Sequence, residues 1–214
     1  MLIVGAKGFA KEVLEVLHQN GQSAEVVFFD DVSSDVPDTV YGFSVLKNEQ
    51  QAREYLKNVD NRFTLGLGNP VLRKNLADKF IKLGGSLTSV ISKTAFIGSI
   101  GNDIKSGVSI MQNSIISSSV KLGIGCIVYY GVNITHDCEV GDYVEISPAS
   151  QLLGGCSIDD FSRIGANATI LPKITIGKNV TVAAGSVVTK DVPDNCMVAG
   201  VPAVIKKELT PLNF

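Results

Sequence analysis

The residues best suited to chemistry in this sequence are His136 and Asp137, which stand side by side in the segment Ile134-Thr135-His136-Asp137-Cys138. An imidazole with a pKa of ~6.5 suits proton transfer near neutrality, and an adjacent carboxylate can orient it. The pair therefore predicts a catalytic base with its orienting acid. An incidental pair of polar surface residues is the alternative that the residues alone leave open.

The pair lies within a six-residue repeat, which is the feature that must position it. From Ile104 to Val188 an aliphatic residue occupies every sixth position without interruption. A helix, with a period of about 3.6, and an alternating strand cannot produce this spacing. It is typical of a parallel β-helix, in which short strands stack in successive coils and bury their aliphatic side chains. The fifteen positions are Ile104, Ile110, Ile116, Leu122, Val128, Ile134, Val140, Ile146, Leu152, Ile158, Ile164, Ile170, Ile176, Val182 and Val188.

A second period of eighteen residues relates Gly123, Gly141, Asp159 and Gly177, each directly after an aliphatic position. Three hexapeptides therefore form one coil, and the coils stack into a triangular prism. Turn-forming residues at the fourth position of the hexapeptides are expected at corners with a left-handed backbone. His136, two residues after an inward aliphatic, is expected to point outward at a corner. The turn formers are Gly107, Asn113, Gly125, Gly131, Asp137, Gly155, Asn167, Asn179 and Gly185.

The cysteines and the second histidine indicate no further chemistry. Cys138 and Cys156 are eighteen residues apart, so they are expected to stack on adjacent coils at a separation that would permit a disulfide. Free buried thiols are the favoured state, and the absence of a CxxC motif leaves a metal site without support. His18 precedes Asn20-Gly21 at a helix end, where a surface histidine is expected.

Residues 1–85 do not follow the sixfold period and alternate between strand and helix patterns. This alternation predicts a small, Rossmann-like parallel sheet with right-handed crossovers. A polar loop is expected between the second strand and the second helix. The expected strands are Met1–Val4, Val26–Phe29 and Arg62–Gly66, and the expected helices are Phe9–His18, Asn48–Lys57 and Val71–Leu83.

Polar and glycine residues gather where these strands end, which is where ligands bind in parallel sheets. Backbone amides at Gly8 and Phe9 could hold a phosphate at a helix start, and Asp30 or Asp31 could accept from a base imide or a ribose hydroxyl. Plain turn chemistry and a solvated strand end are the alternatives. The loop lacks the third glycine of a dinucleotide fingerprint, which argues against a hydride-transferring cofactor. The strand-end residues are Gly5, Gly8, Asp30, Asp31, Gly68 and Asn69.

Composition narrows the class of protein further. The chain has 214 residues and a net charge of −2, without a long Lys/Arg block that would favour nucleic acid or an anionic membrane. The start has no basic leader, and no 18-residue apolar run follows, so a soluble, cytoplasmic protein is expected. We expect domains at 1–85 and 86–205, the second with an irregular start near Ser92–Asn102, and a tail at 206–214.

The chain resembles the hexapeptide-repeat bacterial sugar O-/N-acyltransferases, a family that includes sialic acid O-acetyltransferases and nucleotide-linked 4-amino-sugar N-acetyltransferases. The resemblance covers nearly the full length, and the His-acid-Cys-x-x-Gly-acid segment is its most specific part. The motifs are Val4-Gly5-Ala6-Lys7-Gly8-Phe9-Ala10-Lys11, Phe29-Asp30-Asp31, Gly68-Asn69 with Arg73-Lys74, His136-Asp137-Cys138-Glu139-Val140-Gly141-Asp142, Ile170-Leu171-Pro172 and Ala199-Gly200-Val201-Pro202-Ala203.

This resemblance implies a left-handed β-helix, a homotrimer, acetyl-CoA as acyl donor, no metal, and a sugar or nucleotide-sugar acceptor used in bacterial surface-glycan synthesis. His136 corresponds to the family's base and Asp137 to the acid that orients it. Gly154 would offer its amide to the thioester carbonyl, and Ala166 and Ala184 would line the coenzyme channel. The sugar nucleotide would contact Lys7, Gly8, Phe9, Asp30, Asp31 and Gly68.

Two positions depart from the family pattern. Many members carry a histidine where this chain has Phe9, and some carry a second histidine, against the coenzyme, where Glu145 stands. Both departures concern substrates more than reaction type. Acetylation of a nucleotide-linked amino sugar is the principal interpretation, and O-acetylation of sialic acid or another free or glycan-linked sugar is the alternative.

Three other classes are weighed against this interpretation. A β-helical carbonic anhydrase needs three zinc-binding histidines, and the predicted β-helix contains one. A non-enzymatic scaffold would not need the His136-Asp137 pair. A serine or small-metabolite acyltransferase would leave the Asp30-Asp31 domain without a role.

Overall fold

The computed structural model describes residues 1–213 and separates the chain into two compact units, Met1–Lys93 and a second unit that begins at Thr94. Within the predicted tail 206–214, residues 206–208 belong to the last strand, and Phe214 lies outside the described residues. None of the described helices combines the length and apolar content needed to cross a bilayer.

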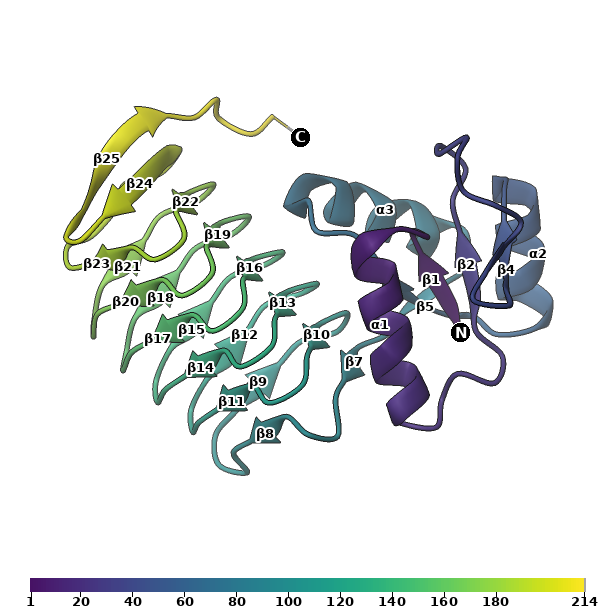
Figure 1. Cartoon of the computed structure of the whole chain (residues 1–214), viewed down its shortest axis with the longest axis horizontal. Helices are drawn as coiled ribbons and strands as arrows, with labels where there is room; N and C mark the ends of the chain where they lie inside the picture. Colours follow the sequence, from purple (N-terminus) through teal and green to yellow (C-terminus); the bar gives the residue numbers. More distant parts are fainter. Residues whose placement is uncertain (214) are drawn as a thin grey trace. The chain divides into compact units, whose positions relative to one another are not determined.

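The first unit is a six-stranded sheet in the order β3-β4-β2-β1-β5-β6, covered by helices (Figure 1). Every strand pair is parallel except β3–β4, so the predicted parallel α/β domain is confirmed. The elements are β1 (Leu2–Val4), α1 (Gly8–Gln19), β2 (Val27–Phe29), β3 (Thr39–Val40), β4 (Phe43–Leu46), α2 (Glu49–Asn58), β5 (Arg62–Leu65), α3 (Pro70–Lys82) and β6 (Ser86–Leu87), followed by β7 (Val90–Ile91).

Local signals explain where two of these helices begin. The side chain of Asn48 accepts a hydrogen bond from the Gln51 amide at 3.0 Å, and that of Asn69 accepts from the Leu72 amide at 3.1 Å. Each asparagine thereby satisfies an amide that the helix itself leaves unpaired. Pro70 opens α3 at a position that needs no N–H donor.

The expected polar loop before Asn48 was wrong in part, because it contains β3 and β4. Val40 and Val45 are buried there, and β4 pairs in parallel with β2 through Phe28↔Val45. These strands were missed because they are short and half-polar at the sheet edge, where burial of alternate residues gives a weak pattern.

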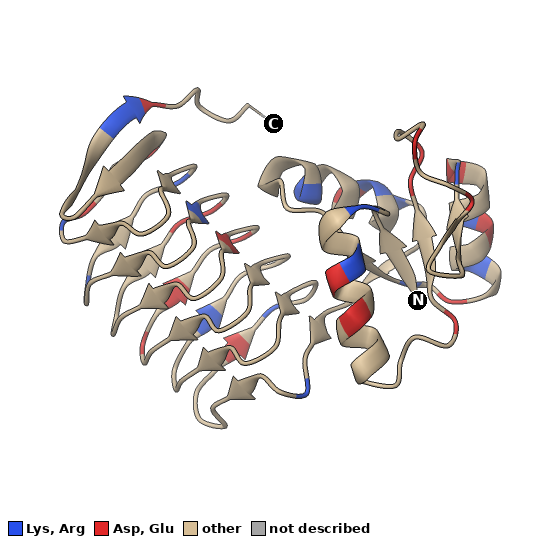
Figure 2. Ribbon diagram, in the orientation of Figure 1, with Lys and Arg blue, Asp and Glu red and all other residues tan. Residues whose placement is uncertain are grey.

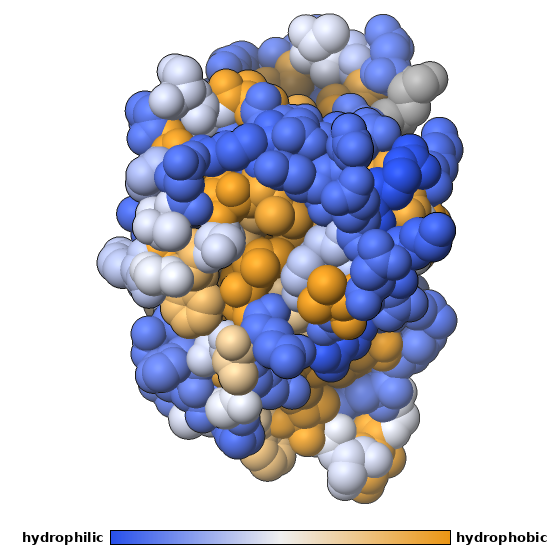
Figure 3. All heavy atoms as spheres, turned by 90° about the vertical axis from the view of Figure 1, so that its right-hand side faces the viewer, coloured by the Kyte–Doolittle hydropathy of each residue, from blue (hydrophilic) through white to orange (hydrophobic). Residues whose placement is uncertain are grey.

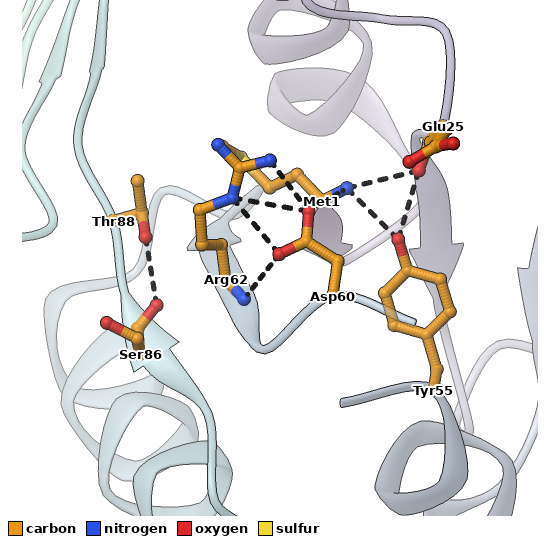
Figure 4. A network of polar contacts seen from close by, with 7 residues as sticks. All are labelled: Met1, Glu25, Tyr55, Asp60, Arg62, Ser86 and Thr88. Atoms are coloured by element: carbon orange, nitrogen blue, oxygen red, sulfur yellow. Dashed lines mark hydrogen bonds and ion pairs between the residues drawn. The ribbon is translucent and has the colours of Figure 1, made fainter. Parts of the chain in front are cut away.

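The start of β1 is fixed by a polar network (Figure 4). The Met1 ammonium lies 3.0 Å from the Asp60 carboxylate and donates to the Tyr55 hydroxyl at 3.0 Å, and Arg62 pairs with Asp60 at 2.8 Å. Burial, together with the nearby Asp60 and Glu25 carboxylates, raises the pKa of Tyr55 to about 12. The phenol therefore remains a neutral hydrogen-bonding partner in this network at neutral pH.

The second unit is a parallel β-helix, as the sixfold period predicts (Figure 1). Strands eighteen residues apart pair in parallel, as in Ile116↔Ile134 and Ile134↔Leu152, and all fifteen period-six aliphatics except the half-buried Ile104 are buried. β8 lies within the stretch expected to be irregular, so the regular coils start earlier than expected. The strands are β8 (Phe96–Ile97), β9 (Asp103–Ile104), β10 (Ser109–Ile110), β11 (Ile115–Ile116), β12 (Lys121–Leu122), β13 (Ile127–Val128), β14 (Asn133–Ile134), β15 (Glu139–Val140), β16 (Glu145–Ile146), β17 (Gln151–Leu152), β18 (Ser157–Ile158), β19 (Arg163–Ile164), β20 (Thr169–Ile170), β21 (Thr175–Ile176), β22 (Thr181–Val182) and β23 (Val187–Val188).

The corners share one backbone conformation whatever residue occupies them. From Gly107 to Gly185 every sixth residue has a φ between 54° and 74°. This confirms the left-handed corners expected at turn-forming residues, and the same geometry is imposed on side chains that disfavour it. The corner residues outside the turn-forming set are Ser119, Tyr143, Ala149, Phe161 and Lys173.

The faces of the prism differ in charge. On the face with β9, β12 and β15, the outward residues Asp103, Lys121 and Glu139 alternate in sign, as Figure 2 shows. The face with β8, β11, β14, β17, β20 and β23 carries no charged outward residue among its strands. Its outward residues are Phe96, Ile115, Asn133, Gln151, Thr169 and Val187.

The last two strands, β24 (Cys196–Gly200) and β25 (Ala203–Glu208), form an antiparallel hairpin that extends the face with β22. Val201, Val204 and Ile205 of this hairpin are exposed.

The face of the molecule in Figure 3 is mostly hydrophilic, with a smaller apolar area near its centre.

Candidate active site

His136 lies at the corner between β14 and β15, and its side chain is 65% exposed, so it points outward as predicted. Two backbone hydrogen bonds to neighbouring coils hold the corner. The His136 carbonyl accepts from the Gly155 amide at 2.9 Å, and the Asp137 amide donates to the Ser118 carbonyl at 3.1 Å. The imidazole therefore stands on a backbone anchored to the coils before and after it.

Asp137 contacts the ring of the residue directly before it. Its Oδ2 lies 2.8 Å from Nδ1 of His136, and its φ of 61° belongs to the left-handed corner. Because a carboxylate can only accept, the hydrogen in this contact belongs to Nδ1, and the neutral ring keeps its lone pair on Nε2. The outer nitrogen is therefore the one that can take a proton.

Gly154, eighteen residues after His136, lies against the imidazole on the next coil. A Cβ at this position would lie 2.7 Å from Cε1 and 2.8 Å from Nε2 of His136, a distance that only a displaced ring could accommodate. Among the hydrogen bonds of residues 1–213, the Gly154 carbonyl accepts from Lys173, whereas its amide donates none. The glycine thus combines space for the ring with an available N–H donor.

The thiols beneath this corner are stacked as predicted. Sγ of Cys156 lies 3.6 Å from Sγ of Cys138, and both cysteines are free and buried. A hydrogen bond from Cys156 lowers the pKa of Cys138, whereas its pairing with Cys138 and burial raise the pKa of Cys156. Cys138 is fully shielded, so it is a poor nucleophile for an external substrate.

The other residues expected at the coenzyme lie elsewhere on the prism. Ala166 and Ala184 follow β19 and β22 at a different corner, where the Gly185 amide donates to the Ala166 carbonyl at 2.8 Å. Glu145 is a half-buried residue of β16, paired in register with Arg163. One copy of the β-helix therefore does not bring the alanines to His136, although both corners border the uncharged face.

In the first unit, the glycine loop leads from β1 into α1. Lys7 is the N-cap residue and forms an exposed ion pair with Asp35 at 2.6 Å. A Cβ at Gly8 would meet nothing within 4 Å, so open space adjoins the helix start. Phe9 is 8% exposed and belongs to the core, so its ring is directed away from solvent.

The two aspartates after β2 have different partners. Oδ1 of Asp30 accepts from the amides of Val32 and Ser33 at 3.2 and 2.8 Å, which ties the loop together. Oδ2 of Asp31 pairs with Lys79 of α3 at 3.3 Å. Gly68, after β5, uses its carbonyl to accept from the buried Arg73.

Two contacts in the candidate sites were missed from the sequence. The contact of Gly154 with the imidazole follows from the eighteen-residue interval, which could have revealed it. The Lys79–Asp31 pair spans 48 residues, and no sequence pattern marks it. Within the described residues, no group of three or more His, Cys, Asp or Glu side chains is arranged to hold a metal ion.

Two family models match the chain. The first, described as the PglD N-terminal domain, covers residues 1–80, and the second, described as bacterial transferase hexapeptide (six repeats), covers residues 155–190. The two matches correspond to the α/β unit and to part of the β-helix.

Solved structures match over nearly the whole length. PerB from Caulobacter crescentus, in complex with CoA and GDP-perosamine, is 31% identical with a TM-score of 0.88, covering 96% of this chain and 96% of that one. The acetyltransferase domain of PglB from Neisseria gonorrhoeae, in complex with acetyl coenzyme A, is 30% identical with a TM-score of 0.87, covering 96% and 98%. WeeI from Acinetobacter baumannii has the same identity, TM-score and coverage.

Curated relatives match over shorter parts of their length. The bifunctional protein GlmU of Prochlorococcus marinus is 28% identical over 87% of this chain and 44% of its own length. The galactoside O-acetyltransferase of Lactococcus lactis is 30% identical over 53% of this chain and 57% of its own length. The chain thus spans about half the length of these two relatives.

Proposed function

The chain belongs to the PglD-type family of nucleotide-sugar N-acetyltransferases with hexapeptide repeats, and we propose that it transfers the acetyl group of acetyl-CoA to the amino group of a nucleotide-linked amino sugar. The observation that carries this proposal is the His136 ring, held by Asp137 at 2.8 Å and seated against Gly154. The bound CoA and GDP-perosamine of PerB support the choice of substrates.

The reaction proposed is direct acyl transfer. Nε2 of His136 accepts a proton from the acceptor amine as the amine nitrogen forms a bond to the thioester carbon. Proton transfer of this kind contributes about 10²–10⁴-fold. The carbon–sulfur bond then breaks, and the imidazolium returns the proton to the departing coenzyme thiolate.

Asp137 and Gly154 support this step in different ways. Asp137 keeps the hydrogen on Nδ1 and stabilises the imidazolium that forms. The Gly154 amide is proposed as a donor to the carbonyl oxygen as it becomes negative, and loss of one such donor typically costs about 3–4 kcal/mol. The observation in support is that this amide makes no other hydrogen bond within residues 1–213.

We propose a homotrimer in which each coenzyme channel is shared between copies. His136 and the Ala166/Ala184 pair lie at the two edges of the uncharged face. If this face turns toward a threefold axis, each His136 edge meets the alanine edge of the neighbouring copy. The exposed Phe96 and Ile115, paired in register on this face, supply apolar contact area.

Light scattering of an Ile115→Lys variant tests this arrangement. The charge should weaken the interface and lower the measured mass from that of a trimer. Thr175→Lys, on a different face, is the matched control and should leave the mass unchanged. A monomeric mass for the unaltered protein at micromolar concentration would contradict the assembly.

The activity is tested by release of the coenzyme thiol from acetyl-CoA with a panel of acceptors. The panel contains UDP- and GDP-linked 4-amino sugars, CMP-sialic acid and free sialic acid. Turnover of a nucleotide-linked amino sugar is expected. Turnover of sialic acid alone would favour the O-acetyltransferase alternative instead. If calorimetry detected no coenzyme A binding, the result would favour a non-enzymatic scaffold.

A further inference from the structure

We propose that Lys79 is a positioning residue that fixes the Asp31 carboxylate for the nucleotide of the acceptor. This inference rests on the proposed function and concerns how its acceptor is held. Lys79 lies on α3, far from Asp31 in the sequence, and its Nζ lies 3.3 Å from Oδ2 of Asp31.

Lys79 is itself held from several sides. Its Nζ lies 3.6 Å from Oε2 of Glu49, at the start of α2, and 5.5 Å from the centre of the Phe29 ring. Phe29 is buried and packs edge-on against Phe80 at 5.0 Å. A cation placed over an aromatic face and between two carboxylates has little freedom to rotate. Lys79 is thus suited to fix the orientation of a partner.

Asp31 depends on this contact in a way that Asp30 does not. The Asp30 carboxylate is oriented by its own loop, through the amides of Val32 and Ser33. Within the described residues, the Asp31 carboxylate accepts its side-chain hydrogen bond from Lys79. Loss of Lys79 should therefore free Asp31 and leave Asp30 in place.

The surrounding charge gives Lys79 a second effect through the same contact. Asp30, Asp31 and Asp38 line a hollow of about 480 Å³ together with one lysine, Lys47. A nucleoside diphosphate is anionic, so an acidic hollow repels it unless cations compensate. Pairing with Lys79 neutralises Asp31, which then offers an acceptor oxygen at a lower electrostatic cost.

Lys79 also joins two parts of the first unit. It lines a second hollow, of about 470 Å³, with Glu49, Arg53 and Lys82. The Lys79–Asp31 contact thus connects a residue that lines the first hollow, Asp31, with one that lines the second, Lys79. The ion pair itself is about one-third exposed, so it contributes little to folding stability, and its removal should not unfold the unit.

The test compares Lys79→Met with Lys82→Met, a lysine on the same helix for which the described residues show no ion pair. Lys79→Met should raise the acceptor KM and the dissociation constants of UDP and GDP by roughly tenfold, since one charged hydrogen bond loses its geometry. The values of kcat and the acetyl-CoA KM should remain within about twofold. Lys79→Arg should restore most of the affinity, and Lys82→Met should match the unaltered protein.

A double variant separates positioning from direct contact. If Lys79 acts through Asp31, then Lys79→Met should add little to Asp31→Asn, whereas additive losses would mean that Lys79 contacts the ligand itself and would overturn the proposal. An unchanged acceptor KM in Lys79→Met, with normal turnover, would overturn this proposal alone. If the unaltered protein turned over no member of the sugar panel, the proposed function would fail and this inference with it.

Discussion

The two units hold their candidate sites together by different kinds of contact. In the β-helix, His136 meets Gly154 from the adjacent coil, and the Ala166 carbonyl accepts from the Gly185 amide of the adjacent coil. In the first unit, the strand-end residue Asp31 depends on Lys79, a partner 48 residues away in the chain. Each coil of a solenoid contacts only its neighbours, so a change there should stay local, whereas a change in the sheet should spread.

The sharpest test of local behaviour is His136→Ala. Loss of the proton acceptor should lower kcat by about 100-fold or more, with little change in melting temperature, because the side chain is 65% exposed. Steady-state kinetics and thermal unfolding measure the two effects. His18→Ala, which removes the other exposed histidine, should leave both unchanged, and near-native turnover of His136→Ala would end its assignment as base.

Gly154→Ala should have the next largest effect, through one neighbouring coil. Its new methyl group would overlap the imidazole, and a ring displaced by about 1 Å should lower kcat by up to about 100-fold. The same substitution made in His136→Ala should cost much less, since no ring remains to be displaced. Equal losses in both backgrounds would mean that Gly154 acts through its amide or the coil backbone and not through the ring.

In the first unit, Asp60→Asn should weaken two contacts at once, one of them to the distant Met1. Asp60 joins the Met1 ammonium to Arg62 and is 11% exposed, so losing its charge should destabilise this unit by about 2 kcal/mol. Urea unfolding followed by a probe in the sheet measures the loss. Asp35→Asn removes an exposed ion pair with Lys7 and should lower the stability less than Asp60→Asn does.

The same carboxylate predicts a pH dependence. Hydrogen bonding from Arg62 holds the pKa of Asp60 well below its usual range. Its contribution is therefore complete above the unfolded pKa of ~3.9 and is lost as the pH falls through the lower folded pKa. The stability gap between the unaltered protein and Asp60→Asn should narrow in that acidic window, and a gap that stayed constant would refute the linkage.

The smallest expected effect is a gain at a β-helix corner. Ser119 is exposed and has a φ of 57°, so Ser119→Gly should relieve backbone strain and stabilise the β-helix by about 1 kcal/mol. Gly131→Ala is the reverse experiment, because a Cβ there meets no atom within 4 Å and adds only backbone strain. Thermal unfolding should move in opposite directions for the two variants.

Most of the β-helix could be predicted from the sequence because its period relates residues to one another without knowledge of the tertiary fold. The aliphatic positions, the corner of His136 and the stacking of Cys138 on Cys156 all follow from the six-residue repeat and the eighteen-residue coil. What the pattern missed are the five corners without a turn-forming residue. At two of them, Tyr143 and Phe161, stacking of coils overrides the preference of aromatic residues for extended backbone.

The first unit could be predicted only at the level of its elements. Its helices and central strands begin and end within two residues of the expected positions, since caps and apolar runs are local signals. β3 and β4 were missed, and so was Lys79 as a partner of Asp31, because both depend on packing between segments far apart in the chain. The roles of the substrate and coenzyme residues remain predictions.

The eighteen-residue coil also limits how this molecule can change in length. An insertion of eighteen residues adds one strand spacing, about 4.8 Å, and leaves every edge aligned. An insertion of six residues between His136 and Gly154 would rotate the following coils by one third of a turn. It would move Gly154 away from His136 to a different edge of the prism. Evolution can therefore lengthen the prism in whole coils at either end, whereas the stretch between these two residues is a fixed interval.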